Sequence, residues 1–252
     1  MISTIKNRVF KKIIVLVFWL ALWQVLSMLI SNGIFVPSPL STLKSLSYLV
    51  KTSDFHIAVL TSLLRIVSGF VSGVLCGFIF GTISAKYSLF KEFTAPALGL
   101  IKAVPVASFI ILAFLWFKSD ILPVFISFLM VLPIIWTTTE SSLSAVDIKY
   151  IQMGEVFGLS KLKIFLKIKL PLIFPAFLSA TLNALGFAWK AGIAAEVITK
   201  PLNSLGGMLE RSKSQLEISE VFAITVVVAV LSVLLEVLLK KLLRGYAYDK
   251  NQ

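Results

Sequence analysis

The chain has 252 residues, of which 58% are hydrophobic and 14% are charged, with a mean hydropathy of +0.97 and a net charge of +12. A soluble domain of this length cannot cover so much apolar surface with so few charged side chains, so the composition indicates an integral membrane protein. The basic residues stand at the ends of apolar segments, which argues against nucleic-acid binding. One cysteine and one histidine exclude a disulfide framework or a zinc cluster within a single chain.

Six apolar stretches are long enough to cross a bilayer core, which needs about 20 helical residues. They predict an all-α, polytopic membrane protein with one transmembrane domain over residues 1–252 and no second domain. The first stretch is longer than the apolar part of a secretory signal, so it is expected to be a retained span. The six predicted spans lie at about residues 13–31, 57–84, 93–117, 120–140, 172–198 and 218–241.

Lysine and arginine predict the orientation of these spans. With a cytoplasmic N-terminus, most of the 24 basic residues fall in cytoplasmic segments, in agreement with the positive-inside rule. Both termini and the loop between the fourth and fifth spans, at about residues 141–171, are therefore expected in the cytoplasm of a multi-pass cell-membrane protein. Two segments are expected outside: residues 41–55, as a short amphipathic helix, and residues 199–217, with Gly206-Gly207 as a flexible turn.

The second predicted span carries glycines at every fourth position, namely Gly69, Gly73, Gly77 and Gly81. Residues four apart lie nearly above one another on a helix, so the glycines predict a groove in which another helix approaches closely. The pattern leaves open whether that helix belongs to the same chain or to a second copy.

Prolines interrupt the third and fourth predicted spans at Pro105, Pro123 and Pro133. Because proline removes a backbone hydrogen bond and kinks a helix, they predict either a moving, water-accessible path or a rigid bundle with kinks.

The fifth predicted span contains Asn183, Trp189, Lys190 and Glu196, and Lys102 precedes Pro105 in the third. Polar groups in a span usually face a cavity or a partner, so these five residues are candidates for a substrate pathway in which the lysines favour an anion. Alternatively, the two lysines extend to opposite membrane surfaces. Lys190 and Glu196 lie about 240° apart around a helix, so they are not expected to neutralise each other.

The basic loop before the fifth span predicts two short amphipathic helices. Met153, Val156 and Phe157 share one helical face, and Leu162, Phe165 and Leu166 share another. Gly158 is expected to end the first helix, Ser160 to cap the second, and Pro171 to begin the next span. One interpretation is a membrane-surface linker whose lysines contact lipid phosphate. The loop contains five lysines: Lys149, Lys161, Lys163, Lys167 and Lys169.

The spacing in this loop favours another interpretation. Gly158, nine further residues, and then Ile168-x-Leu170-Pro171 resemble the EAA loop of ATP-binding cassette importer permeases, whose pattern is E-A-A-x3-G-x9-I-x-L-P. This chain has Gln152-Met153-Gly154 where that family has Glu-Ala-Ala. The resemblance implies that the loop is a coupling helix that docks into a groove on a cytoplasmic ATPase. It assigns the coupling role to Gln152, Met153, Gly154, Phe157, Gly158, Leu162, Ile168, Leu170 and Pro171.

Short motifs elsewhere resemble the nitrate/sulfonate/taurine branch of these permeases. The resemblance implies a homodimer, two cytoplasmic ATPase subunits that bind ATP and magnesium, and an extracytoplasmic solute-binding protein. It implies a small solute such as a sulfonate, nitrate, bicarbonate, or a thiamine or riboflavin precursor. The motifs are Phe35-Val-Pro-Ser-Pro39, Ser62-Leu-Leu-Arg65, Leu115-Trp-Phe117, Ala145-Val-Asp147, Ala188-Trp189 and Ala195-Glu196.

No phosphate-binding loop, nucleophile elbow or metalloprotease motif occurs in the sequence, so we expect a transport subunit without cofactor, metal site or catalytic residues of its own. The predicted function is the permease subunit of an ATP-driven importer. An alternative is a proton-coupled secondary carrier that uses Glu140 or Glu196, although the sequence has no visible inverted repeat. A purely structural membrane subunit is the third possibility.

Overall fold

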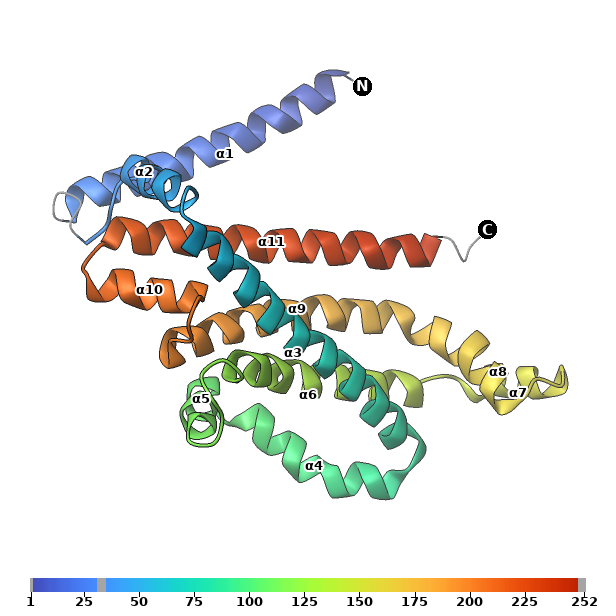
Figure 1. Cartoon of the computed structure of the whole chain (residues 1–252). Coiled ribbons are helices and arrows are strands. Elements are labelled where there is room, and N and C mark those ends of the chain that lie inside the picture. Colours follow the sequence, from blue (N-terminus) through green and yellow to red (C-terminus); the bar gives the residue numbers. More distant parts are fainter. Residues whose placement is uncertain (1, 31–34, 249–252) are drawn as a thin grey trace.

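The structure, a computed structural model, describes residues 2–30 and 35–248. Every regular element among these residues is a helix (Figure 1). The helices are α1 (Ile2–Leu29), α2 (Pro39–Leu49), α3 (Ser53–Lys86), α4 (Ser88–Ala103), α5 (Val106–Phe114), α6 (Leu122–Ser144), α7 (Ile148–Val156), α8 (Lys161–Ile164), the π-helical turn η1 (Phe165–Lys169), α9 (Leu170–Thr199), α10 (Leu205–Ser214) and α11 (Ile218–Tyr248).

Four helical segments are long and apolar enough to cross a membrane: α3, α6, the continuous stretch Lys161–Thr199, and Ile218–Leu242 of α11. The pair α4 and α5 meets the same criterion together, as a fifth, broken span. The apolar part of α1, Ile13–Leu29, is shorter, and the predicted end of the first span at residue 31 lies outside the described residues. The all-helical, multi-pass prediction is therefore confirmed, and the number of six spans only in part.

The third predicted span is broken at Pro105. Helices α4 and α5 bend by 101°, and Val104 before the proline is extended, as a pre-proline residue prefers. Lys102 consequently lies in the last turn of α4. The other two prolines do not break a helix: Pro123 stands in the first turn of α6, where its missing N–H has no partner to lose, and α6 continues through Pro133.

The glycine ladder of α3 lies against α6 of the same chain. A methyl group added to Gly69 would lie 2.2 Å from the carbonyl oxygen of Val124, and one added to Gly73, Gly77 or Gly81 would lie within 3 Å of an α6 atom. The two backbones approach closely because these positions carry no side chain. The helix that the ladder accommodates therefore belongs to the same subunit.

Helix α9 packs in the centre of the subunit. Trp189 is 1% exposed and donates a hydrogen bond from Nε1 to the carbonyl oxygen of Val228 on α11, at 3.0 Å. Ile66 of α3, Leu205 of α10 and Ile224 of α11 are buried in the same apolar cluster. A second cluster joins α5, α6 and α9.

The molecule has two distinct ends (Figure 1). Helices α7 and α8 form one end, while α2, α10 and the α5–α6 loop lie at the opposite end. The N-terminal end of α1 and the C-terminal end of α11 point the same way as α7 and α8. Both ends of the described chain and the basic hairpin therefore share one side.

Candidate functional site

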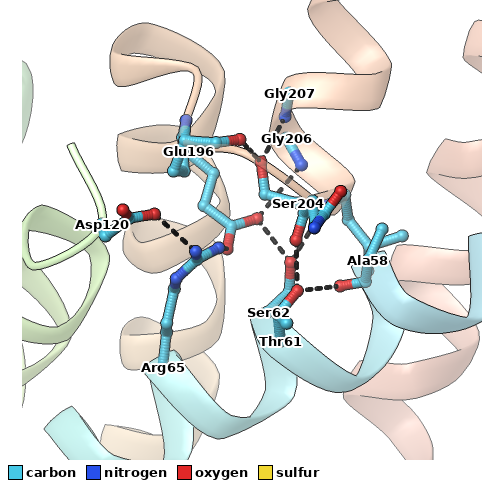
Figure 2. Close-up of polar contacts among 12 residues, drawn as sticks. Ala58, Thr61, Ser62, Arg65, Asp120, Glu196, Ser204, Gly206 and Gly207 are labelled. Atoms are coloured by element: carbon cyan, nitrogen blue, oxygen red, sulfur yellow. Dashed lines mark hydrogen bonds and ion pairs between the residues drawn. The ribbon is translucent and has the colours of Figure 1, made fainter. Parts of the chain in front are cut away.

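A buried carboxylate organises the α2–α10 end of the molecule. Glu196, in the last turn of α9, is 0% exposed. Its Oε2 accepts a hydrogen bond from Ser62 Oγ of α3 at 2.7 Å and another from the N–H of Gly206 at 3.1 Å (Figure 2). Ser62 Oγ in turn accepts the N–H of Leu205 at 2.9 Å. The carboxylate therefore occupies the N-terminus of α10, where free N–H groups and the helix dipole favour negative charge.

The chain reaches this geometry by folding back on itself after α9. Lys200 and Asn203 adopt left-handed backbone conformations, and Ser204 caps α10 by accepting the N–H of Gly207 at 3.0 Å. A methyl group on Gly206 would lie 2.4 Å from Cβ of Glu196, so only glycine permits this approach. The predicted flexible turn at Gly206-Gly207 is wrong, because both glycines belong to the first turn of α10.

Arg65 connects Glu196 to two further segments. Its Nη2 forms an ion pair with Oδ1 of Asp120 in the α5–α6 loop at 2.6 Å and donates to the carbonyl oxygen of Leu202 at 3.2 Å. Its Nη1 lies 3.8 Å from Oε1 of Glu196, and neither of these two atoms has a hydrogen-bond partner. As Figure 2 shows, one network therefore joins α3, α9, α10 and the α5–α6 loop.

A cleft of about 630 Å³ opens at the same end, between α2, the start of α3, α10 and the start of α11. Asp54, Glu217 and Glu220 contribute carboxylates to its lining, and Arg211 contributes a cation. Glu210, also in the lining, pairs with Lys200 at 3.2 Å, and this ammonium holds the pKa of Glu210 below its ordinary value. The cleft is a polar recess of mixed charge.

At the opposite end, α7 and α8 form a hairpin. Asp147 caps α7 by accepting the N–H of Lys149 at 2.9 Å, and Ser160 caps α8 by accepting the N–H of Lys163 at 3.4 Å. Gly158 between them has φ +68°, a left-handed conformation that favours glycine. The predicted end of the first helix and the cap of the second are confirmed.

Helix α7 packs closely on the segment that follows the turn. A methyl group on Gly154 would lie 2.8 Å from Cδ1 of Ile168 and 3.0 Å from Cγ1 of Ile164. The apolar side chains at the tip point away from this contact: Val156 is 86% exposed, Phe157 76% and Leu162 67%. The hairpin thus has a closed interior and an apolar outer surface.

The second short helix is not separate from the fifth span, contrary to the prediction. Residues Lys161–Thr199 form one continuous helix with a π-helical turn at Phe165–Lys169. Pro171 has no N–H to bond to the previous turn, and a π-helical turn accommodates such a missing bond without ending the helix. Pro171 therefore lies within this helix near the turn, and no break precedes the span.

The profile of the protein family described as the binding-protein-dependent transport system inner membrane component matches residues 73–247. The chain belongs to this family of permeases. Together with its apolar helices, the match identifies a multi-pass membrane protein of an ATP-binding cassette transporter.

Curated relatives of the permease agree with this assignment. It is 24% identical over 211 residues to a probable ABC transporter permease of Brucella melitensis, covering 83% of this chain and 85% of the relative. It is 24% identical to the taurine transport system permease of Escherichia coli, with 88% and 82% covered, and 26% identical to the bicarbonate transport system permease of Synechocystis, with 75% and 65% covered.

A solved structure shows the same fold. The permease aligns with a chain of the MetNI methionine ABC transporter in an inward-facing conformation, with a TM-score of 0.56 and 14% identity. The alignment covers 75% of the permease and 92% of the MetNI chain.

The residues that the EAA-like pattern singled out occupy three environments in the permease. Gly154 is buried, and Ile168 and Leu170 are half-buried. Gly154 and Ile168 pack against each other inside the hairpin. The remaining residues of the pattern lie on its surface, namely Gln152, Met153, Phe157, Gly158, Leu162 and Pro171.

The five candidate pathway residues do not form one cluster. Lys102, Asn183 and Lys190 are exposed on faces that the rest of the permease leaves uncovered. Trp189 and Glu196 are buried inside the subunit. Lys190 and Glu196 make no ion pair with each other among the described residues, as their angular separation predicted.

Sequence reasoning missed the partners of Glu196. In the sequence Ser62 and Arg65 belong to a family-like motif, and no local pattern connects Asp120 or Gly206 to Glu196. One signal could have found the ion pair: Arg65 and Glu196 are opposite charges near the predicted outer ends of two spans. In an apolar surrounding such charges are expected to lie near each other.

Proposed function

We propose that this permease is the membrane-spanning subunit of an ATP-driven, binding-protein-dependent importer of a small solute. The observation that carries the proposal is the α7–α8 hairpin, which presents an exposed apolar tip at the end of a 39-residue helix. An apolar surface exposed on a short polar segment indicates a protein contact. The predicted solutes are a sulfonate, nitrate, bicarbonate, or a thiamine or riboflavin precursor, and among these the taurine and bicarbonate relatives support a sulfonate or bicarbonate.

In this proposal a separate cytoplasmic ATPase subunit binds ATP and magnesium, and its surface binds the hairpin of the permease. Gly154 packs α7 against Ile164 and Ile168, so a force on α7 passes to the long helix without a flexible joint. At its other end, Glu196 fixes the same helix to α3 and α10. A displacement of the hairpin would therefore move the α2–α10 end as well.

The proposed orientation places the hairpin and both chain ends in the cytoplasm. The α2–α10 end then faces outward, and its cleft lies where an extracytoplasmic solute-binding protein would dock. The excess of lysine and arginine in the proposed cytoplasmic segments supports this orientation.

The solute path is proposed to lie between two copies of the permease. Asn183 and Lys190 share the face of α9 that the subunit leaves uncovered, and Lys102 lies beside the break between α4 and α5. A polar stripe on a spanning helix is costly against lipid, so a second copy and a water-filled path would cover it. Trp189 and Glu196 would support this path from inside the subunit.

The test is reconstitution of the permease with its ATPase subunit. Phe157→Ser should abolish co-purification of the ATPase, because it removes the largest side chain at the tip of the hairpin. The matched control is Phe35→Ser, an exposed phenylalanine outside the hairpin, which should leave co-purification intact. Normal co-purification of the Phe157 variant would contradict the docking role.

Solute uptake separates this function from a proton-coupled carrier, which the family assignment does not favour. Uptake into proteoliposomes should require ATP and persist when the proton gradient is collapsed. Uptake that follows the gradient without ATP would overturn the proposal.

A further inference from the structure

Two lysines of the hairpin, Lys161 and Lys163, lie at a helix N-terminus, where the helix dipole disfavours positive charge. Lys161 and Lys163 are the first and third residues after the Ser160 cap, at the N-terminus of the continuous helix Lys161–Thr199. A helix N-terminus carries a partial positive charge and is stabilised by acidic residues, so two cations in this turn reduce its stability. Such a local conflict typically marks a functional position.

Neither lysine pairs with a carboxylate of the described residues. Lys161 and Lys163 are exposed and take part in none of the ion pairs found there. The acidic residues near them in sequence are Asp147, which caps α7, and Glu155 on α7. Gln152 is neutral at the position where the EAA pattern has glutamate.

Lipid headgroups do not account for the two lysines. The helix Lys161–Thr199 has 39 residues, which span about 58 Å at 1.5 Å per residue. A bilayer with its headgroups is about 45 Å thick, so in the proposed orientation a straight helix along the bilayer normal, with Thr199 at the outer headgroups, would extend about 13 Å beyond the inner headgroups at its N-terminal end. Lys167 and Lys169, further along the helix, are nearer the membrane surface, whereas Lys161 and Lys163 stand beyond it.

The same two lysines lie next to the apolar tip. Leu162 stands between them in the sequence and is 67% exposed, and Phe157 before the turn is 76% exposed. A partner that covers the tip must also bring the two ammonium groups into its interface. Charges taken out of water without a partner are costly, so the facing surface has to supply carboxylates.

Building on the proposed function, we propose that the ATPase surface that receives this hairpin is an apolar pocket with a carboxylate-bearing rim, in which Lys161 and Lys163 pair with acidic side chains of the partner. In this arrangement the permease contributes the cations and the ATPase contributes the carboxylates. A coupling loop with the glutamate of the EAA pattern would instead contribute a carboxylate from the permease. The exposed apolar tip calls for an apolar pocket on the partner, and the two unpaired lysines beside it call for carboxylates at the rim of that pocket.

The experiment measures ATPase binding to the permease in nanodiscs of neutral lipid, at low ionic strength and at about 0.15 M salt. Lys161→Gln combined with Lys163→Gln should weaken binding about tenfold at low ionic strength and flatten the salt dependence, because two interface pairs are lost. Lys240→Gln combined with Lys241→Gln removes the same charge from the end of α11 and should change neither quantity.

Phe157→Ala distinguishes failure of this inference from failure of the proposed function. It should weaken binding at both salt concentrations, since its contribution is apolar. Should the lysine variant bind like the wild type while Phe157→Ala binds weakly, the acidic rim is wrong and docking stands. Should neither change matter, the docking function is wrong as well. A loss that appears only in vesicles of anionic lipid would identify lipid as the partner and overturn the inference.

Discussion

At the scale of single residues, Glu196 explains why a carboxylate is present in a spanning helix. A buried charge is costly in an apolar surrounding unless hydrogen bonds and an opposite charge compensate it. Glu196 receives hydrogen bonds from Ser62 and Gly206 and lies 3.8 Å from Arg65. Its position is therefore accounted for by the folding back of α10.

Removal of this carboxylate should destabilise the permease. Glu196→Ala removes the acceptor of Ser62 Oγ and of the N–H of Gly206 and the carboxylate nearest Nη1 of Arg65. Breaking a buried pair in this way costs about 3 kcal/mol. We expect a lower melting temperature of the purified protein in detergent.

Asp120→Asn provides the comparison for this variant. The Asp120 side chain is 58% exposed, so its pair with Arg65 should contribute less than about 1 kcal/mol. Equal effects of the two substitutions would contradict the central position of Glu196.

At the scale of elements, two helix contacts are unusually close. Helix α3 packs on α6, and α7 packs on the helix that begins with α8. Both depend on glycine, which acts in two ways. The α3 ladder and Gly154 of α7 provide space, whereas Gly158 provides a left-handed backbone conformation in the turn. The two kinds of glycine should respond differently to substitution.

Gly69→Ala tests the space between α3 and α6. Its methyl group would lie 2.2 Å from the carbonyl oxygen of Val124, so the helices must separate, at a cost of about 1–3 kcal/mol. Gly99→Ala on α4 is the control, since nothing lies within 4 Å of the added methyl group. Thermal unfolding in detergent should show a loss for Gly69→Ala only.

Gly158→Val tests the turn of the hairpin. No atom lies within 4 Å of the added Cβ, so any effect comes from φ +68°, which costs a residue with a side chain about 1–2 kcal/mol. Because valine is β-branched, we expect loss of transport-coupled ATP hydrolysis with the protein still in the membrane.

Gly158→Asn is the matched variant for the turn. Asparagine tolerates the left-handed conformation better than other residues with side chains, so it should retain most of the coupled activity. Wild-type transport by Gly158→Val would argue against a defined turn at this position.

At the scale of the whole molecule, the chain separates two surfaces. The basic hairpin lies at the same end as the N-terminal end of α1 and the C-terminal end of α11, and α2 and α10 lie at the opposite end (Figure 1). Residues of α2 and α10 line the cleft. The long helix Lys161–Thr199 connects the two ends directly. The proposed transfer of motion from a cytoplasmic ATPase to the outer end of the permease would need such a connection.

The orientation can be measured by cysteine labelling, because Cys76 is the only native cysteine. In a Cys76→Ser background, a cysteine at Phe157 should react with a membrane-impermeant reagent in inverted vesicles and not in intact cells. A cysteine at Asn203, exposed at the opposite end, should show the reverse pattern. Labelling of both positions from the same side would contradict the proposed topology.

The sequence by itself determined the membrane class, the approximate positions of four spans, and the end of α7 and the cap of α8 in the basic hairpin. These features depend on hydropathy and on nearby residues: Asp147 and Ser160 cap helices within three residues of themselves, and Gly158 ends one. The EAA-like spacing likewise predicted the permease family that the profile match over residues 73–247 shows, because it is a pattern of neighbouring positions.

Only the tertiary structure decided which segments meet. Ser62 and Glu196 are 134 residues apart in sequence, and no local pattern pairs them. The same holds for the choice of α6 as the partner of the glycine ladder and for the burial of Trp189 beside exposed Lys190. Composition and spacing predict the surface properties of a single helix. Contacts between helices depend on how all of them pack together in three dimensions.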